Sequence, residues 1–169
     1  MRLSRNIAAL ALVLLAAPAG AELAANQPDL AFGAYQRGLY QTAFTEAMKR
    51  IDADKHDGAA MTLVAELLSQ GLGVPENDAE ALRWYRLAAN EGDKNAQFSL
   101  GLAYLTGKGA EKDVATATAW LKKAAAQDHA GAWYNLGVIA LEGNGVVADF
   151  KRAAVDFRRS ADLGFADAA

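Results

Sequence analysis

The stretch AQFSLGLAYLTGKG, residues 96–109, decides the fold, because its pattern returns along the chain. Its closing pair, Gly107 and Gly109, recurs 36 residues earlier at 71 and 73 and 36 residues later at 143 and 145. A self-similar period between about 20 and 50 residues indicates a repeat array, whose units bury their apolar sides only against their neighbours. The sequence therefore predicts such an array.

The first half of each unit has the spacing of one helix face. Small and apolar residues recur at i, i+4 and i+5, which is one stripe of a helix. The end of each such helix is a glycine, at Gly71, Gly107 and Gly143, where the missing Cβ permits the left-handed backbone of a helix terminus. The stripes are Ala60, Val64 and Ala65, then Ala96, Leu100 and Gly101, then Ala132, Leu136 and Gly137.

The second half of each unit predicts a helix that runs back along the first. Asp78, Asp113 and Asp149 can accept hydrogen bonds from the first turn of these helices. We therefore expect an all-α fold, a right-handed α-solenoid of stacked antiparallel helix pairs. The predicted buried stripes are Ala81, Trp84, Leu87 and Ala88, then Ala117, Trp120, Leu121 and Ala124, then Ala153, Phe157 and Ala161, with helix ends at Gly92, Asp128 and Gly164.

The N-terminus has the pattern of a secretory signal peptide. Arg2 and Arg5 precede an apolar run at residues 7–17, and the small residues Ala19 and Ala21 follow it. The run is shorter than the roughly 20 residues needed to span a bilayer. We expect residues 1–21 to be a signal peptide cleaved after Ala21, which predicts a periplasmic or secreted protein with no membrane span after cleavage.

The mature chain divides into a cap and three repeats. Residues 22–28 are expected to be a short linker, and 29–57 a degenerate helical hairpin that caps the N-terminal end, with helices at 29–37 and 40–53 joined by Gly38. Repeats are expected at 58–94, 95–130 and 131–169. The last repeat lacks a C-terminal cap in the sequence, which favours an exposed apolar edge, partner docking or self-association through that hairpin, or a truncated chain.

Charge and composition exclude several classes of partner and site. Cleavage removes Arg2 and Arg5, so 15 of the 17 basic residues remain against 20 acidic ones, a net charge of −5. This argues against a nucleic-acid partner. The chain has no cysteine, and His56 and His129 lie in turns between units without metal-ligand spacing. We therefore expect solvated turn histidines, no metal site, no cofactor and no catalytic residues.

The repeat pattern is similar to that of a known family. Ala-x-x-x-Leu-Gly-x-x-Tyr-x-x-Gly-x-Gly, followed by Ala-x-x-Trp and Ala-Ala, resembles the Sel-1-like repeat family, which is related to the tetratricopeptide repeats. Residues 96–129 match the pattern best, and the resemblance covers about 58–169. The chain departs from the pattern at Ala65, Leu68, Ala140 and Asp156, where the tryptophan position is expected to move one place onto Phe157.

The resemblance implies that the first helices line a concave surface that binds a protein or peptide. Phe98 and Tyr134 would either form an aromatic strip that receives a peptide, with Ser99 and Asn135 bonding its backbone, or fill the core between repeats. The expected partner-binding positions are Thr62, Glu66 and Ser69, then Phe98, Ser99, Leu102 and Thr106, then Tyr134, Asn135, Val138 and Glu142.

These patterns favour an exported, non-enzymatic repeat scaffold that binds a protein or peptide, in envelope regulation or assembly. One alternative is a cell-wall or β-lactam-interacting hydrolase, although no serine of the chain stands in a Ser-x-x-Lys arrangement. Another alternative is a self-assembling structural module, which follows from the uncapped last hairpin.

Overall fold

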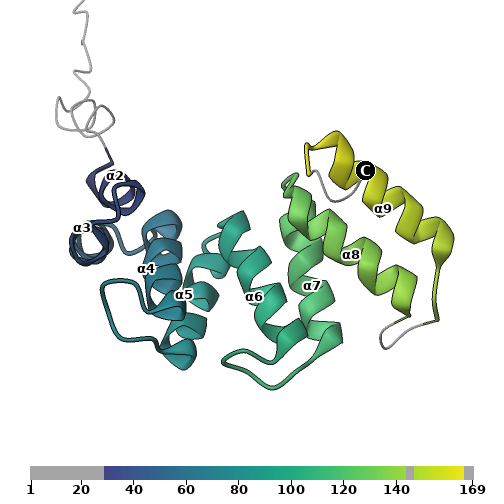
Figure 1. Cartoon of the computed structure of the whole chain (residues 1–169), viewed down its shortest axis with the longest axis horizontal. Coiled ribbons are helices and arrows are strands. Elements are labelled where there is room, and N and C mark those ends of the chain that lie inside the picture. Colours follow the sequence, from purple (N-terminus) through teal and green to yellow (C-terminus); the bar gives the residue numbers. More distant parts are fainter. Residues whose placement is uncertain (1–28, 144–146, 166–169) are drawn as a thin grey trace, which may run out of the picture.

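The computed structural model describes residues 29–143 and 147–165, and in these ranges it contains eight α-helices and no strand. The helices stack in chain order from one end of the molecule to the other (Figure 1). The expected all-α solenoid of helix pairs is confirmed. The helices are α2 (Leu30–Gln36), α3 (Tyr40–Ala53), α4 (Gly58–Gln70), α5 (Asp78–Asn90), α6 (Lys94–Thr106), α7 (Val114–Ala125), α8 (Ala130–Glu142) and α9 (Phe150–Asp162).

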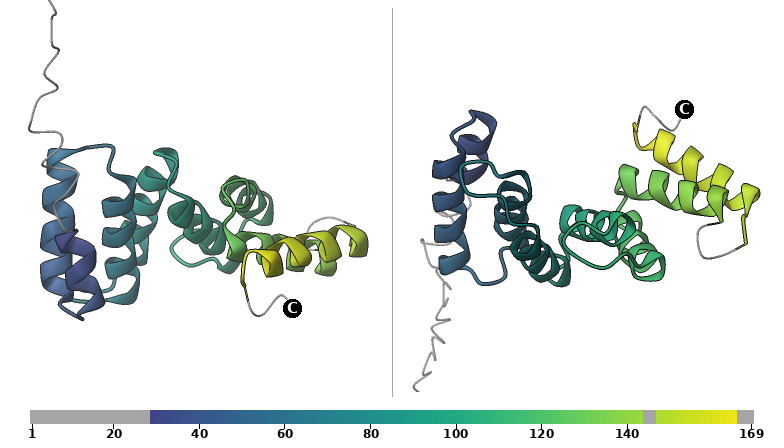
Figure 2. Two further views of the ribbon diagram at one scale, coloured as in Figure 1. Left: turned by 90° about the horizontal axis from the view of Figure 1, so that it is seen from above. Right: turned by 60° about the horizontal axis from the view of Figure 1, so that its bottom comes forward.

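The pairing of the helices follows the repeat. The members of each pair, α2 with α3, α4 with α5, α6 with α7 and α8 with α9, pack against each other, and each second helix packs on the first helix of the next pair. Successive pairs are displaced and rotated along the stack (Figure 2). Because α4 also contacts α6, the first helices of the first two repeats lie close together on the inner side of the stack. The expected signal peptide, the linker, Gly145 and residues 166–169 lie outside the described residues.

Polar side chains and glycines set the helix ends. Asp113 and Asp149 cap α7 and α9 as predicted, and each carboxylate accepts a first-turn backbone N–H. The expectation for Asp78 is wrong by one residue, because the Asn77 side chain caps α5 and Asp78 is already helical. Gly71, Gly107 and Gly143 end the first helices at φ of 64°, 81° and 67°, which confirms the predicted left-handed terminus.

The core differs from the predicted stripes at two positions. Leu87 is half-exposed, and Leu82 and Tyr85 are buried on α5 instead. Phe157 does not take the tryptophan position. Its ring faces Gly137, where an added Cβ would lie 2.7 Å from the ring. Leu121 faces Gly101 in the same way in the preceding repeat, at 2.8 Å from an added Cβ.

Phe157 therefore keeps the register of Leu121, 36 residues on, and its neighbour Asp156 holds the place of Trp120. Asp156 is 1% exposed. The last repeat thus has a buried carboxylate where the repeat before it has an indole.

Candidate functional site

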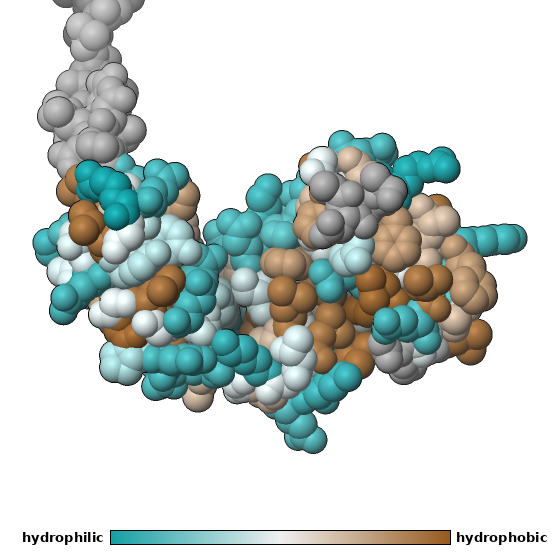
Figure 3. Space-filling model, viewed as in Figure 1, coloured by the Kyte–Doolittle hydropathy of each residue, from teal (hydrophilic) through white to brown (hydrophobic). Residues whose placement is uncertain are grey.

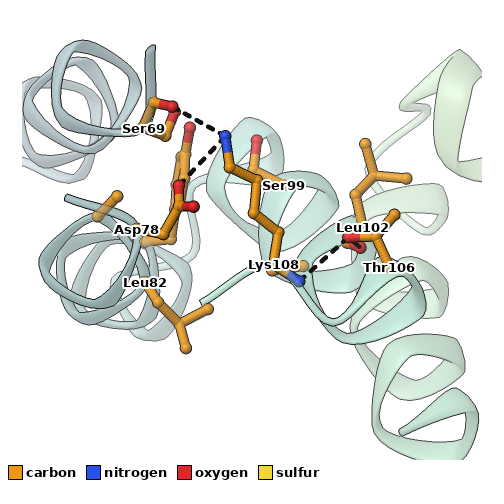
Figure 4. A pocket seen from close by; sticks show the side chains of 10 residues that line it. Ser69, Asp78, Leu82, Ser99, Leu102, Thr106 and Lys108 are labelled. Atoms are coloured by element: carbon orange, nitrogen blue, oxygen red, sulfur yellow. Dashed lines mark hydrogen bonds and ion pairs between the residues drawn. The ribbon is translucent and has the colours of Figure 1, made fainter. Parts of the chain in front are cut away.

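A cavity of about 290 Å³ opens on the inner side of the repeats, between α4, α5 and α6 (Figure 4). Small and aliphatic side chains, among them Leu82 and Ala103, form much of its wall. Four of the predicted partner-binding residues line it, namely Ser69, Ser99, Leu102 and Thr106. The structure therefore brings predicted positions from two different repeats into one groove, which we call the α4–α6 groove.

Lys108 closes one end of this groove by reaching back to the preceding repeat. Its Nζ lies 3.1 Å from Asp78 Oδ1 and donates to the backbone carbonyl of Ser69 at 2.9 Å. The hydrogen bond with Asp78 is the main cause that raises the pKa of Lys108. Figure 4 shows Ser69 and Asp78 both joined to the Lys108 ammonium. A cation of the second repeat thus connects α4 and α5 of the first at the rim.

Polar groups also gather deeper in the groove. Tyr85 is 8% exposed, and this burial raises the pKa of its phenol, while hydrogen bonding with the Ser69 and Ser99 side chains acts in the opposite direction. The predicted residue Glu66 does not line the groove. It is half-buried next to it, where burial raises the pKa of its carboxyl and the nearby Asp93 charge adds to the effect. Hydroxyl groups of the groove therefore lie beside an apolar wall, an arrangement that can bind an apolar side chain and hydrogen-bond the peptide around it.

Thr62 is placed away from the groove surface. It is 5% exposed, and its hydroxyl lies 2.9 Å from the carbonyl of Gly58 and 2.9 Å from Asp93 Oδ1. Asp93 is the N-cap of α6. Thr62 therefore connects the first repeat to the start of the second and has little surface for a partner.

Each of the two predicted aromatic residues has an aromatic partner of its own. Phe98 stacks on His129 with ring centroids 4.2 Å apart. Tyr134 packs against Phe157 and Phe165, at centroid distances of 5.6 and 5.1 Å. Within the part of the chain that the structure describes, the rings of Phe98 and Tyr134 are not in contact with each other. Both rings are half-buried and belong to the packing between helices at least as much as to a surface.

The expectation of a solvated His129 is wrong. Its side chain is half-buried under Phe98, and its Nδ1 accepts the backbone N–H of Ala132 as the N-cap of α8. Burial lowers the pKa of His129, and the Lys94 charge lowers it further. His56, in contrast, is exposed, and its Nδ1 lies 2.9 Å from Glu91 Oε2, which raises its pKa.

The remaining predicted positions lie on α8, in the third repeat. The Asn135 side chain donates to the carbonyl of Gly131, one turn earlier in the same helix. Val138 is half-buried and Glu142 is exposed. These residues do not share the α4–α6 groove with the positions from the first two repeats.

Sequence reasoning missed Asp78, Tyr85 and Lys108 as groove residues. The sequence feature that could have indicated Lys108 is its position between Gly107 and Gly109, in the turn that follows α6. Across residues 29–143 and 147–165, no group of three or more His, Asp or Glu side chains could hold a metal ion. In the same ranges no helix is long and apolar enough to cross a membrane.

The Sel1 repeat model matches residues 58–93, 94–129 and 131–165. Among solved structures, a Sel1 repeat protein from Oxalobacter formigenes is similar at 36% identity, a TM-score of 0.77, 84% of this chain and 57% of that one. A protective antigen of uropathogenic Escherichia coli with an SLR fold is similar at 28% identity and a TM-score of 0.70, over 76% of this chain and 27% of that one.

A third structure, the cysteine rich protein B of Helicobacter pylori, shares the fold at 23% identity and a TM-score of 0.58, over 76% of this chain and 93% of that one. No curated protein matches the chain. The chain spans less than two thirds of the Oxalobacter and Escherichia coli proteins.

Proposed function

Because this chain belongs to the Sel1 repeat family, we propose that it is an exported, non-enzymatic scaffold that binds a segment of a partner protein in the α4–α6 groove. Sel1 repeats form a scaffold that is generally used for protein interaction. The observation that carries the proposal is the cavity of about 290 Å³ shared by two repeats, with hydroxyl groups beside an aliphatic wall. The pathway we propose is envelope regulation or assembly.

The chemistry of the groove fits an extended or helical peptide. An apolar side chain of the peptide would bury surface against Leu82, Leu102 and Ala103, at roughly 25 cal/mol for each Å² removed from water. The Ser99 hydroxyl can donate and accept a hydrogen bond, whereas the Ser69 hydroxyl, which donates to the carbonyl of Glu66 at 3.1 Å, can accept one from a backbone N–H of the peptide. Such a site gives modest affinity and uses a few anchors, as peptide grooves generally do.

The test of the groove is selection of binders from a random peptide library against the mature chain. A Leu102→Arg substitution places a charge on the apolar wall and should weaken the selected peptides at least about tenfold, which corresponds to about 1.4 kcal/mol. The matched control is Leu87→Arg, since Leu87 is half-exposed and does not line the groove. Equal affinity of the two variants would place peptide binding outside the groove.

Export is a separate part of the proposal and is supported by the first 21 residues. Arg2 and Arg5, the apolar run and the small residues at 19 and 21 have the order of a cleavable signal. Expression of the full chain in a bacterial host should yield a periplasmic product whose mass lacks residues 1–21. A cytoplasmic product of full mass would contradict export without affecting the groove.

Self-association is a second candidate function, favoured by exposed apolar side chains near α8 and α9. Val147 is 91% exposed, Phe150 69% and Val155 61%. Figure 3 shows that apolar surface gathers on the half of the viewed face that α6 to α9 form. Light scattering on purified mature chain would show a concentration-dependent mass, reduced by Phe150→Ser with Val155→Ser. A constant monomer mass would exclude assembly through these residues.

A further inference from the structure

A second cavity, of about 540 Å³, lies between α7, α8 and α9. Three aliphatic residues of α8, Leu136, Ile139 and Ala140, line one side, and Asp156 of α9 is also among the lining residues. The side chain of Asp156 is 2% exposed. The cavity therefore combines an apolar wall with a buried hydrogen-bond acceptor.

The repeat explains why this space exists. Ala140 stands 36 residues after Tyr104, and Asp156 stands 36 residues after Trp120. In the preceding repeat both Tyr104 and Trp120 are partly buried and pack against the hydrophobic core. Two large rings of one repeat are thus replaced by a methyl group and a carboxylate in the next, at the same places between the helices.

A basic residue is retained at the repeat position that contacts the Tyr104 hydroxyl. At the junction of the first and second repeats, Arg86 of α5 donates from Nη2 to the hydroxyl of Tyr104 of α6 at 3.1 Å. Lys122 occupies the place of Arg86, 36 residues on, and lines the cavity. The cavity is therefore lined by a lysine at the repeat position of the cation that binds the Tyr104 hydroxyl.

The Asp156 carboxylate has room for a further donor. The Arg152 Nε lies 2.8 Å from both of its oxygens. A carboxylate offers about four lone-pair sites, and this N–H supplies a single proton. Because a buried acceptor with incomplete hydrogen bonding raises the free energy of the folded protein, a ligand that brings an N–H or O–H is favoured over a purely apolar one.

We propose that this cavity binds one aromatic side chain of a partner protein, a tryptophan or a tyrosine, whose ring takes the space of the missing pair and whose N–H or O–H donates to Asp156. The inference rests on the proposed function in that the ligand belongs to a partner protein. The cavity and the α4–α6 groove are lined by different residues, so each can be tested while the other is disabled.

The test is titration of the mature chain with N-acetyl-tryptophanamide and N-acetyl-tyrosinamide, followed by backbone amide chemical shifts. We expect saturable shifts at residues that line the cavity, such as Ala115, Ile139 and Arg152. N-acetyl-phenylalaninamide, which has a ring without a donor, should bind several-fold more weakly. Absence of saturable shifts at these residues, or equal binding of all three compounds, would overturn the proposal.

Filling the cavity supplies the matched variants. Ala140→Tyr restores the residue of the preceding repeat and should abolish the shifts, whereas Ala119→Tyr, at an exposed position of α7 outside the cavity, should leave them unchanged. Binding that survives Ala140→Tyr would also overturn the proposal. Leu102→Arg, which disables the α4–α6 groove, should not alter these titrations, so failure of the groove and failure of the cavity are distinguishable.

Discussion

At the scale of single residues, His129 supports the junction of the second and third repeats only while its ring is neutral. Its Nδ1 accepts the N–H of Ala132 and its face packs on Phe98, and protonation would remove the acceptor. Burial lowers its pKa in the folded state, so between the unfolded and folded pKa values the unfolded chain binds more protons. The contribution of neutral His129 to the free energy of unfolding is therefore present above the pKa that His129 has in the unfolded chain, near 6.5, and is lost as the pH falls below that value.

Replacing His129 should therefore flatten the loss of stability in acid. His129→Asn keeps a side-chain acceptor for the cap and should show a smaller fall in melting temperature between pH 7.5 and 5.5 than the wild-type protein. His56→Asn is the control of opposite sign, because the Glu91 hydrogen bond raises the pKa of His56 and stabilises the folded state below its unfolded pKa. That variant should lose more stability in acid. The measurement is the melting temperature at several pH values, and parallel plots of melting temperature against pH for all three proteins would contradict these roles of the two histidines.

The turn glycines differ in what surrounds them. Gly109 and Gly92 both have positive φ, of 74° and 92°. A Cβ on Gly109 would lie 2.6 Å from the backbone oxygen of Asp78, whereas one on Gly92 would meet nothing within 4 Å. The backbone penalty of an alanine is of the same kind at both sites, so the clash should make Gly109→Ala about 1–3 kcal/mol more destabilising than Gly92→Ala. Urea denaturation measures both, and equal losses would show that the turn moves aside.

At the scale of the elements, the sequence predicted helix bounds well because the signals that end helices are local. Gly71 and Gly107 adopt the left-handed backbone that few other residues tolerate, and Asp113 offers an acceptor to its own first turn. Side-chain register was harder to predict. The conspicuous repeat of Trp84 and Trp120 suggested that Phe157 was a displaced tryptophan, although it keeps the register of Leu121.

The groove was predicted only in part for a similar reason. First-helix positions such as Ser99 and Leu102 were expected on the concave face from the resemblance to the repeat family, and they do line the groove. Lys108 and Asp78 are far apart in sequence and meet through the stacking of two repeats, at a distance that no local pattern encodes. The same resemblance predicted Thr62 on the concave face, but Thr62 is buried and its hydroxyl bonds the Asp93 cap of the next repeat.

Asp93 caps α6 and also bonds Thr62 of α4, so its removal should destabilise the protein more than removal of an ordinary helix cap. Its Oδ1 accepts the N–H of Ala96 at 2.7 Å and lies 2.9 Å from the Thr62 hydroxyl. Asp93→Ala should cost about 2 kcal/mol, near the upper end for caps, because it also leaves the buried Thr62 hydroxyl without this partner. Asp113→Ala, at an exposed cap within its own repeat, should cost about 1 kcal/mol. Chemical denaturation of both variants is the measurement, and equal costs would mean that the link to Thr62 adds nothing.

At the scale of the whole molecule, stability should fall along the stack because each repeat contacts only its neighbours. Seven residues of α4 are buried, among them Val64 and Leu67, whereas α9 buries only Ala153, Asp156 and Ser160. The third repeat also carries the cavity of about 540 Å³. Replacing one large buried side chain by alanine in a protein core typically costs about 2–5 kcal/mol, and Ala140 stands where the preceding repeat has Tyr104. The third repeat should therefore open on its own, below the free energy of global unfolding.

Native-state hydrogen exchange tests this gradient. The amides of α8 and α9 should exchange through an opening at least about 2 kcal/mol lower in free energy than the amides of α4 and α5. Ala140→Tyr, which refills the space, should raise the protection of α8 and α9 and leave α4 and α5 unchanged, because nearest-neighbour coupling confines the gain to the repeats that share the cavity. Uniform protection from α4 to α9 would mean that the stack unfolds as one cooperative unit. The cavity and the buried Asp156 would then not lower the free energy of opening of the third repeat below that of its neighbours.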